Sequence, residues 1–283
     1  MGVLNHNLIN EASGIAASKR FPDRLYHIND SGGGPYFYIT GIDGNNAQKI
    51  KIVGAEKRNS DFEDLSLGEC LDNKSCLFIA DIGDNLEKRK SVQILVIVEK
   101  DGYGEAVEPD QKLILRYPDR PHNAEGMAVH PNGDIYIITK EENLKNFKAF
   151  PVHVFRIEKD LWQNAGNRVL ELSPVGVIDI PGITREDTLF GQIVSAFDIS
   201  PDGRRFIVLT YENAIEFNID PSKSVIKPTA DLKDGVDYQV IELSPLPQQE
   251  SISYLPSGKG FLYNTEYHGF EAPVLRVDCL DGE

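Results

Sequence analysis

The sequence predicts an all-β fold, a five-bladed β-propeller whose blades are four-stranded antiparallel sheets. Three observations predict it: five segments open alike, each is followed after a turn by a second strand with a polar end, and the openings recur at intervals of tens of residues. A repeat on this scale is typical of propellers and solenoids. Each opening has a Ser or Glu, then a small or acidic residue, then an apolar run. The openings lie at residues 11–15, 61–65, 123–127, 195–199 and 249–252.

Strand signals dominate the chain from the first blade to the last. Short runs rich in Ile, Val, Tyr and Phe are separated by Gly, Asn, Asp and Pro, which is typical of strands and turns. Pro presets φ and Gly supplies a positive φ, so residues 130–134, 200–204 and 256–260 are expected to turn between the first and second strands of their blades. Residues 159–165 predict a turn or two of helix, and residues 141–150 are a polar excursion inside a blade.

The end of the chain predicts how the ring closes. The third strand of the fifth blade, at residues 273–277, comes close to the C-terminus, so the outer strand of that blade is expected from residues 2–9. Closure of this kind removes exposed strand edges. We therefore expect one domain that spans residues 1–283.

Composition narrows the class of partner. The net charge is −15, from 29 Lys and Arg against 44 Asp and Glu. This argues against nucleic acids and anionic membranes, whose binding requires phosphate charge to be neutralised. It suits divalent cations and a soluble monomer, although an acidic surface can also serve solubility alone. We expect a small-molecule substrate or ligand, no nucleic-acid partner and no membrane insertion.

The sequence is compatible with more than one cellular compartment. No stretch approaches the roughly 20 apolar residues of a membrane-spanning helix, and the N-terminus has no signal-peptide pattern. Either the protein is cytoplasmic, or it is periplasmic or secreted and its leader is absent from this chain. Cys70 and Cys76 flank a probable hairpin loop and are equally compatible with a disulfide, which implies an oxidising compartment, and with two free thiols. Neither lies in a zinc or nucleophile pattern.

The openings predict a ring of oxygen ligands at the axis, because the first strand of each blade lines the channel. Three carboxylates in a narrow channel repel one another unless they are protonated, hydrated or bound to a cation. An all-oxygen ring without His or Cys favours calcium (Ca²⁺) over zinc or copper. The alternative is a water-filled channel without metal. In order along the chain, the predicted ligands are Ser13, Glu63, Glu125, Ser195 and Glu250.

The fourth blade is the weakest point of this alignment. A strict alignment on Asp198 and Ile199 puts Phe197 in the ligand position instead of Ser195. Ser195 lies two positions earlier and therefore on the same side of the strand.

A second ring of polar residues follows the second strands and is expected at the same mouth. Asp30 or Asp81 could orient a water as general base, Lys140 could neutralise an oxyanion, and His268 could shuttle protons. The alternative for each is turn capping or simple solvation.

The order Ser, Glu, Glu, Ser, Glu around five blades resembles the calcium-activated nucleotidases, which are soluble apyrases. Their Glu-Leu-Ser-Glu-Leu opening is similar to Glu11-Ala-Ser13-Gly14-Ile15, their Asp-Asp-Arg-Thr-Gly to Asn29-Asp30-Ser31-Gly32-Gly33, and their Ser-Ser-Phe to Ser195-Ala-Phe197. Their ligand glutamates match Glu63, Glu125 and Glu250. The resemblance implies one central calcium that holds a substrate diphosphate or its attacking water.

This chain departs from that pattern at Ser31, which stands where the apyrases have Arg. It is also similar to uncharacterised bacterial envelope propellers described as phytase-esterase-like, which fit residues 80–85 and 122–126 better. The leading expectation is a calcium-dependent hydrolase of phosphate esters or anhydrides at the channel mouth. The alternatives are a non-catalytic propeller that binds a ligand or a protein around a structural calcium, and a calcium-dependent lactonase or esterase.

Overall fold

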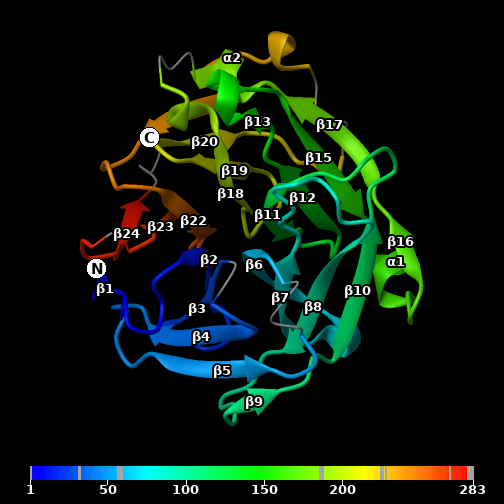
Figure 1. Cartoon of the computed structure of the whole chain (residues 1–283), viewed down its shortest axis with the longest axis vertical. Helices are drawn as coiled ribbons and strands as arrows, with labels where there is room; N and C mark the ends of the chain where they lie inside the picture. The colour runs from blue at the N-terminus through cyan, green and yellow to red at the C-terminus, as the bar shows by residue number, and fades with distance from the viewer. Residues whose placement is uncertain are drawn as a thin grey trace.

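The structure, a computed structural model, describes residues 2–30, 33–55, 60–184, 188–223, 226, 228–267 and 269–278. Five β-sheets stand around a central axis, with the inner strand of each sheet next to the axis (Figure 1). The predicted all-β, five-bladed propeller is therefore confirmed. Within the described ranges, no helix combines the length and the apolar character needed to cross a bilayer.

Each blade contains four antiparallel strands whose order from the axis outwards follows the chain, except that the first strand of the chain is the outermost strand of the last blade. From the inside outwards, the blades are β2 (Ala12–Ala17), β3 (Arg24–Asn29), β4 (Tyr36–Gly41) and β5 (Gln48–Ile52); β6 (Phe62–Glu69), β7 (Ser75–Asp81), β8 (Val92–Val98) and β10 (Gln111–Arg116); β11 (Ala124–Val129), β12 (Ile135–Thr139), β15 (Val152–Ile157) and β17 (Ser173–Ile178); β18 (Val194–Ile199), β19 (Phe206–Thr210), β20 (Asn213–Phe217) and β21 (Tyr238–Glu242); and β22 (Gln249–Tyr254), β23 (Gly260–Thr265), β24 (Pro273–Asp278) and β1 (Gly2–Val3).

The N-terminus closes the ring as predicted, because β1 pairs with β24. The paired strand is shorter than the predicted residues 2–9, since the chain turns at Asn5, whose carbonyl accepts hydrogen bonds from the amides of Leu8 and Ile9. Leu4 and Ile9 are buried beside the first and last blades. Apolar packing therefore reinforces a ladder of only two residue pairs.

Two short extra strands tie neighbouring blades together at the rim. β9 (Ala106–Val107) lies between β8 and β10 in the chain and pairs in parallel with β5 of the first blade. β16 (Val169–Glu171) lies between β15 and β17 and pairs in parallel with β10 of the second blade. Both cover outer edges that would otherwise be open to other chains.

The remaining regular segments are short. The predicted helical segment contains α1 (Lys159–Gln163), whose Trp162 is fully buried and donates a 2.8 Å hydrogen bond to the carbonyl of Gly133. The others are α2 (Ile180–Thr184) and the 3₁₀ turns η1 (Leu71–Asn73), η2 (Leu144–Asn146), η3 (Phe190–Gln192) and η4 (Thr229–Asp231).

Cys70 and Cys76 form a disulfide in this structure, which selects one of the two alternatives that the sequence allows. The bond spans the connection from β6 to β7, with η1 between the two cysteines. Their Cα atoms are 5.8 Å apart, a usual separation for a disulfide.

Two buried carboxylates connect the inner strands of neighbouring blades. Asp64 accepts one hydrogen bond from the amide of the next residue (2.7 Å) and one from the amide of Met127 in the third blade (2.9 Å). Asp198 does the same with its own next residue (2.8 Å) and with Tyr254 in the fifth blade (2.7 Å). Each carboxylate thus satisfies two backbone donors and joins two sheets.

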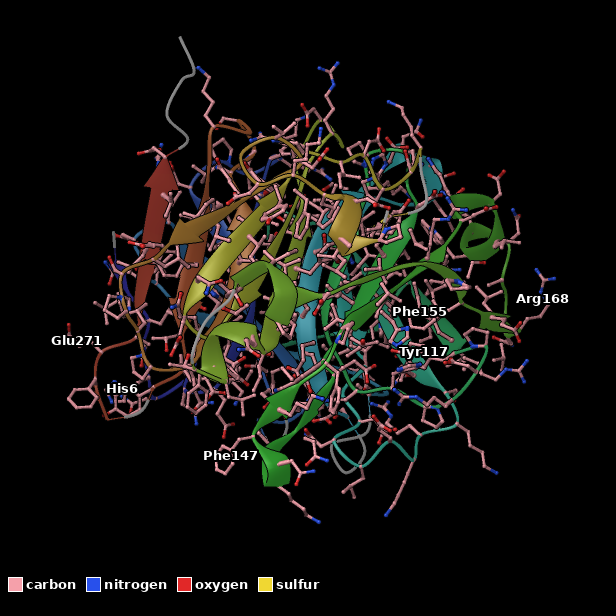
Figure 2. The ribbon with its side chains drawn as sticks, turned by 90° about the horizontal axis from the view of Figure 1, so that it is seen from above. His6, Tyr117, Phe147, Phe155, Arg168 and Glu271 are labelled. Carbon is pink, nitrogen blue, oxygen red and sulfur yellow. A yellow bond between two sulfur atoms is a disulfide. The ribbon has the colours of Figure 1, made fainter. Side chains whose placement is uncertain are left out.

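The inner strands begin, and the second strands end, on one face of the ring, which we call the mouth. The polar excursion of the third blade forms a hairpin here, made of β13 (Glu142–Asn143), η2 and β14 (Lys148–Ala149). Phe147 lies at the tip of the hairpin and stands clear of the body of the protein (Figure 2). The loops of the mouth therefore differ in length from blade to blade around a regular core.

Replacing Asp64 by Asn is expected to lower the free energy of unfolding by about 1–3 kcal/mol. The amide side chain has a single acceptor oxygen, so one of the two backbone amides that Asp64 binds loses its partner. Chemical denaturation of the wild type and the variant measures the difference. Asp231→Asn is the control, because Asp231 is exposed and its change should stay within about 0.5 kcal/mol. Equal losses in both variants would contradict the bridging role.

Candidate functional site

Every inner strand begins with a β-bulge. In the ladder between the first and second strands of each blade, the register shifts by one residue on the inner strand. A bulge bends the strand and re-aims one side chain, and bulges are common beside active sites. The five bulged residues are Ser13, Glu63, Glu125, Ser195 and Glu250, which are the five predicted axial ligands.

The bulge also settles the alignment of the fourth blade. Ser195 is the residue skipped between Val194 and Ala196, whereas Phe197 pairs regularly with Val208 and packs in the core against Phe206. Ser195 is therefore the structural equivalent of the three glutamates. Its hydroxyl is buried and has no hydrogen-bond partner among the described residues.

Beyond the bulges the channel narrows, because the inner strands pack against one another. A Cβ atom on Gly14 would lie 2.8 Å from the amide nitrogen of Leu65, and one on Gly126 would lie 2.5 Å from the Cβ of Phe197. Such distances are shorter than real Cβ contacts, so these two positions favour glycine. β6 and β18 also contact each other across the axis. We call this level the waist, and it separates the mouth from the opposite end of the channel.

Three carboxylates meet on the side of the mouth formed by the first and second blades. Asp30 follows β3, Asp61 precedes β6, and Glu63 is the bulged residue of β6. One oxygen from each side chain lies within 4.8 Å of the others. Carboxylate oxygens at this spacing can share one divalent cation. We call these three residues the acidic trio.

Gly83 provides the space that the acidic trio occupies. A Cβ atom at this position would lie 2.0 Å from Oε1 of Glu63 and 2.5 Å from Oδ2 of Asp61. Its amide donates to the carbonyl of Asp61, which holds the loop after β7 against the trio. Any larger residue would therefore displace two of the three carboxylates.

The acidic trio is electrostatically strained when it holds no cation. Burial, Asp30 and Glu125 raise the pKa of Asp61 to about 6. Burial, Glu125, Asp30 and Asp61 raise the pKa of Glu63 well above its usual range. A bound cation would favour the charged form of both groups and relieve this repulsion.

The opposite side of the mouth already contains a cation. The ammonium of Lys140 lies 3.1 Å from Oε1 of Glu125 and 2.9 Å from the hydroxyl of Tyr211. Burial alone would lower the pKa of Lys140, but Glu125, Tyr211 and Glu250 raise it well above its usual range. Lys140 is therefore charged and neutralises Glu125. From the sequence, Glu125 and Glu63 are expected to share one cation; in the structure, Glu125 pairs with this lysine.

Two further glutamates border the mouth. Burial, Glu125 and Glu266 raise the pKa of Glu250 well above its usual range, with Lys140 acting against them. Burial, Asp30 and Glu11 raise the pKa of Glu266 to about 7. A carboxyl group with a pKa near neutrality can both donate and accept a proton at physiological pH.

The predicted catalytic residues have different surroundings. Asp30 belongs to the acidic trio, and Lys140 lies on the opposite side of the mouth, against Glu125 and Tyr211. Asp81 is buried and accepts hydrogen bonds from the amide of Asp61 (2.9 Å) and from Gln93 (2.6 Å), and it pairs with Arg89 at 2.8 Å. These contacts suit a role for Asp81 in positioning Asp61. They suit the role of a general base less well. His268 lies outside the described residues.

The predicted serines also differ from each other. The hydroxyl of Ser13 donates a 2.6 Å hydrogen bond to the backbone carbonyl of Glu63 and so links the first blade to the second.

Asp61 and Glu266 were not among the predicted ligands or catalytic residues. The sequence does contain a signal for Asp61. It lies two positions before Glu63, and another acidic residue, Glu11, lies two positions before Ser13 in the first blade.

Comparison with known proteins concerns the fold alone. No family model and no curated protein matches the chain. Among solved structures, the chain is similar to the Pan2 WD40 domain of Neurospora crassa, with a TM-score of 0.36 and 9% identity over 93% of this chain and 62% of that one. It is also similar to a chain of a nidogen/laminin complex, with a TM-score of 0.48 and 12% identity over 94% and 75%. The resemblance to the calcium-activated nucleotidases stays a prediction.

If the acidic trio binds calcium, replacing Gly83 by Ala is expected to weaken that binding by about 10- to 100-fold. The added methyl group displaces the carboxylates of Glu63 and Asp61, while the backbone at this position suits any residue because its φ is not positive. Isothermal titration with Ca²⁺ measures the affinity. Gly104→Ala is the matched control, since nothing lies within 4 Å of its added Cβ. Unchanged affinity in Gly83→Ala would place calcium elsewhere.

Proposed function

We propose that this protein is a calcium-dependent hydrolase of phosphate esters or anhydrides whose site is the mouth of the propeller. The observation that carries the proposal is the acidic trio, Asp30, Asp61 and Glu63, with a charged lysine on the opposite side of the same mouth. A cation site and a fixed ammonium around one mouth suit a substrate whose charge increases during the reaction.

The donor set supports calcium over softer metals. All three side chains of the acidic trio offer oxygen, and the bulge of the fourth blade adds the Ser195 hydroxyl, which has no hydrogen-bond partner among the described residues. Hard cations prefer oxygen ligands, and calcium accepts six to eight of them with flexible geometry. Asp30, Asp61 and Glu63 would hold the ion, and substrate or water oxygens would complete its coordination.

Calcium bound there would supply Lewis-acid polarisation of a phosphoryl oxygen. Residues of the chain itself would stabilise the negative charge that develops and accept the proton of the attacking water. Lys140 is held by Glu125 and Tyr211, so its ammonium is positioned to stabilise negative charge on a substrate oxygen without losing entropy on binding. Glu266, with its pKa near 7, is suited to take a proton from the attacking water.

The charge of the mouth also limits which substrate can enter. With a net charge of −15, the protein repels anions at long range. A phosphate ester can approach only where the local charge is reversed, which requires the cation at the acidic trio and the ammonium of Lys140 together. Binding of such a substrate should therefore depend on calcium.

A second candidate function is ligand binding around a structural calcium. The pairing of Lys140 with Glu125 favours it, because that half of the mouth is already neutral without any substrate. In this alternative calcium raises the melting temperature but no substrate is turned over. A lactonase or esterase would use the same metal and would be detected with carboxylic ester substrates.

Replacing Glu63 by Gln is expected to lower calcium-dependent hydrolysis on the order of 100-fold or more, because one charged ligand of the acidic trio is lost while the size of the side chain is kept. Initial rates are measured for nucleoside diphosphates, p-nitrophenyl phosphate, lactones and p-nitrophenyl acetate, each in calcium and in chelator.

The control for this experiment is Glu105→Gln, since Glu105 is exposed and lies beside β9 at the outer edge of the first blade, away from the inner strands that hold the acidic trio. Thermal melts of all variants verify that each is folded. Calcium at about 100 times its dissociation constant should stabilise the wild type by about 2.7 kcal/mol and Glu63→Gln by less. Stabilisation without turnover of any substrate would support the structural calcium and contradict the hydrolase.

A further inference from the structure

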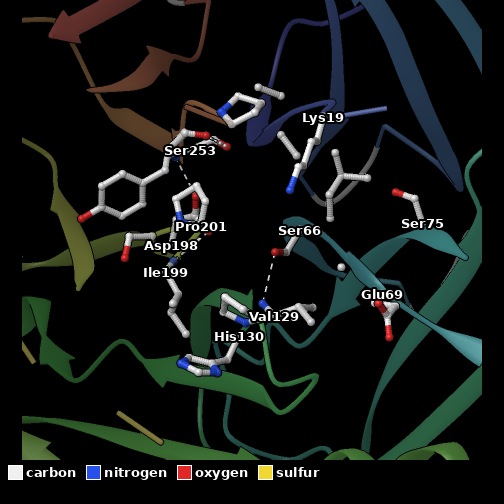
Figure 3. Close-up of a pocket in the computed structure, with 18 of the residues that line it drawn as sticks. Lys19, Ser66, Glu69, Ser75, Val129, His130, Asp198, Ile199, Pro201 and Ser253 are labelled. Atoms are coloured by element: carbon white, nitrogen blue, oxygen red, sulfur yellow. Dashed lines mark hydrogen bonds between the residues drawn. The ribbon is translucent and has the colours of Figure 1, made fainter. Parts of the chain in front are cut away.

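The channel has a cavity at the end opposite the mouth. It measures about 370 Å³ and lies among the turns that join the inner strands to the second strands (Figure 3). This volume falls within the range of small-molecule sites in proteins. The waist separates it from the acidic trio, so it is a distinct compartment.

Three polar side chains from three blades converge on the inner end of this cavity. Ser66, Asp198 and Ser253 occupy the same position of their inner strands, three residues after the bulge. All three line the cavity, and Figure 3 shows them around its centre. Ser66 accepts a hydrogen bond from the amide of Val129 at 3.2 Å and keeps its own proton for another partner.

Asp198 is the charged group of this set. Each of its oxygens accepts one backbone amide, from its own next residue or from Tyr254, and the carboxylate also interacts with the side chain of Ser253. A carboxylate has about four acceptor positions, so it retains capacity for a ligand. No lysine, arginine or histidine forms an ion pair with Asp198 in the part of the chain that the structure describes. Burial raises the pKa of Asp198 to about 7, as expected for a carboxyl group that lacks a counter-ion.

The lining of the cavity combines apolar and polar side chains. Three prolines, Pro131, Pro201 and Pro256, come from the turns of the third, fourth and fifth blades. Val129 and Ile199 add further apolar surface. A site with an apolar wall and few convergent polar groups binds a ligand through its body and orients it through its polar end.

We propose that this cavity binds a small molecule with a protonated primary amine and an apolar body. The ammonium would bind Asp198 and donate to the hydroxyl oxygens of Ser66 and Ser253, and the apolar body would pack against the prolines. An ammonium has three donors and no acceptor, so one carboxylate and two hydroxyl oxygens match it in number.

Lys19 and Lys74 also line the cavity, and they do not reverse its preference for a cation. Both are exposed, so water and salt screen their charges, and Lys74 pairs with Asp72 at 3.3 Å. Asp198 is half-buried among apolar atoms, where the interaction between charges is stronger. The inner carboxylate therefore decides which charge the cavity selects.

Three probes of one size and shape test the proposal on the full chain: 3-phenylpropylamine, 3-phenylpropanol and 3-phenylpropionate. Isothermal titration should show the amine binding at least about tenfold more tightly than the alcohol or the acid, since a charge-assisted hydrogen bond is roughly twice as strong as a neutral one. The affinity should be the same in calcium and in chelator, because the site lies beyond the waist. Equal or tighter binding of the acid, or no binding of the amine at millimolar concentration, would overturn the proposal.

Two variants locate the site. Asp198→Asn removes the charge and should reduce the affinity for 3-phenylpropylamine about tenfold, to the affinity of the wild type for 3-phenylpropanol. Ala17→Phe adds a large side chain to the lining of the cavity and keeps Asp198 itself, so it should abolish binding of all three probes, which keeps the test decisive if Asp198→Asn fails to fold. Ala106→Phe is the control, because Ala106 is exposed on β9 at the outer rim. Amine binding that survives in Ala17→Phe would show that the amine binds elsewhere.

Discussion

The β-bulge at the start of each inner strand is the constraint on which the rest of the site depends. A regular strand alternates its side chains between the two faces of the sheet, and both faces of a propeller blade pack against neighbouring blades. The extra residue at Ser13, Glu63, Glu125, Ser195 and Glu250 interrupts this alternation once in every blade. It frees one position per blade from the core, and these positions can carry charge without unfolding the sheets.

The five bulges are arranged nearly symmetrically around the axis, but the charges around the mouth are not. If all three bulged glutamates were ionised around one axial cation, the site would be nearly symmetric. Lys140 prevents this, because it neutralises Glu125 from within the chain. The remaining negative charge gathers on the side of Asp30, Asp61 and Glu63. A substrate between the two sides would face a metal ion on one side and an ammonium on the other.

The fold was predictable from the sequence because each repeat contains its own signals. The polar opening and the apolar run are local signals that recur five times, and a Pro-Gly turn follows in three of the repeats, so together they predict five blades. The register of Ser195 was predictable only in part, since Phe197 offers an equally good local alignment and the ladder with β19 decides between them. The acidic trio and the pairing of Lys140 depend on which loops meet across the mouth. Gly83 is an example, because its role depends on contact with Glu63 and Asp61, which lie about twenty positions earlier in the chain.

The waist has a consequence for how the two ends of the channel can be used. Gly14 and Gly126 allow the inner strands to approach closely, and Asp64 bridges the second and third blades at the same level. A ligand at one end therefore cannot reach the other end through the channel. Any communication between the two ends would have to pass through the inner strands themselves, for example along β18, which carries Ser195 at the mouth and Asp198 at the opposite cavity. Because Asp198 also binds the backbone of β22, a ligand that pulls on its carboxylate acts on the strand that begins near Glu250.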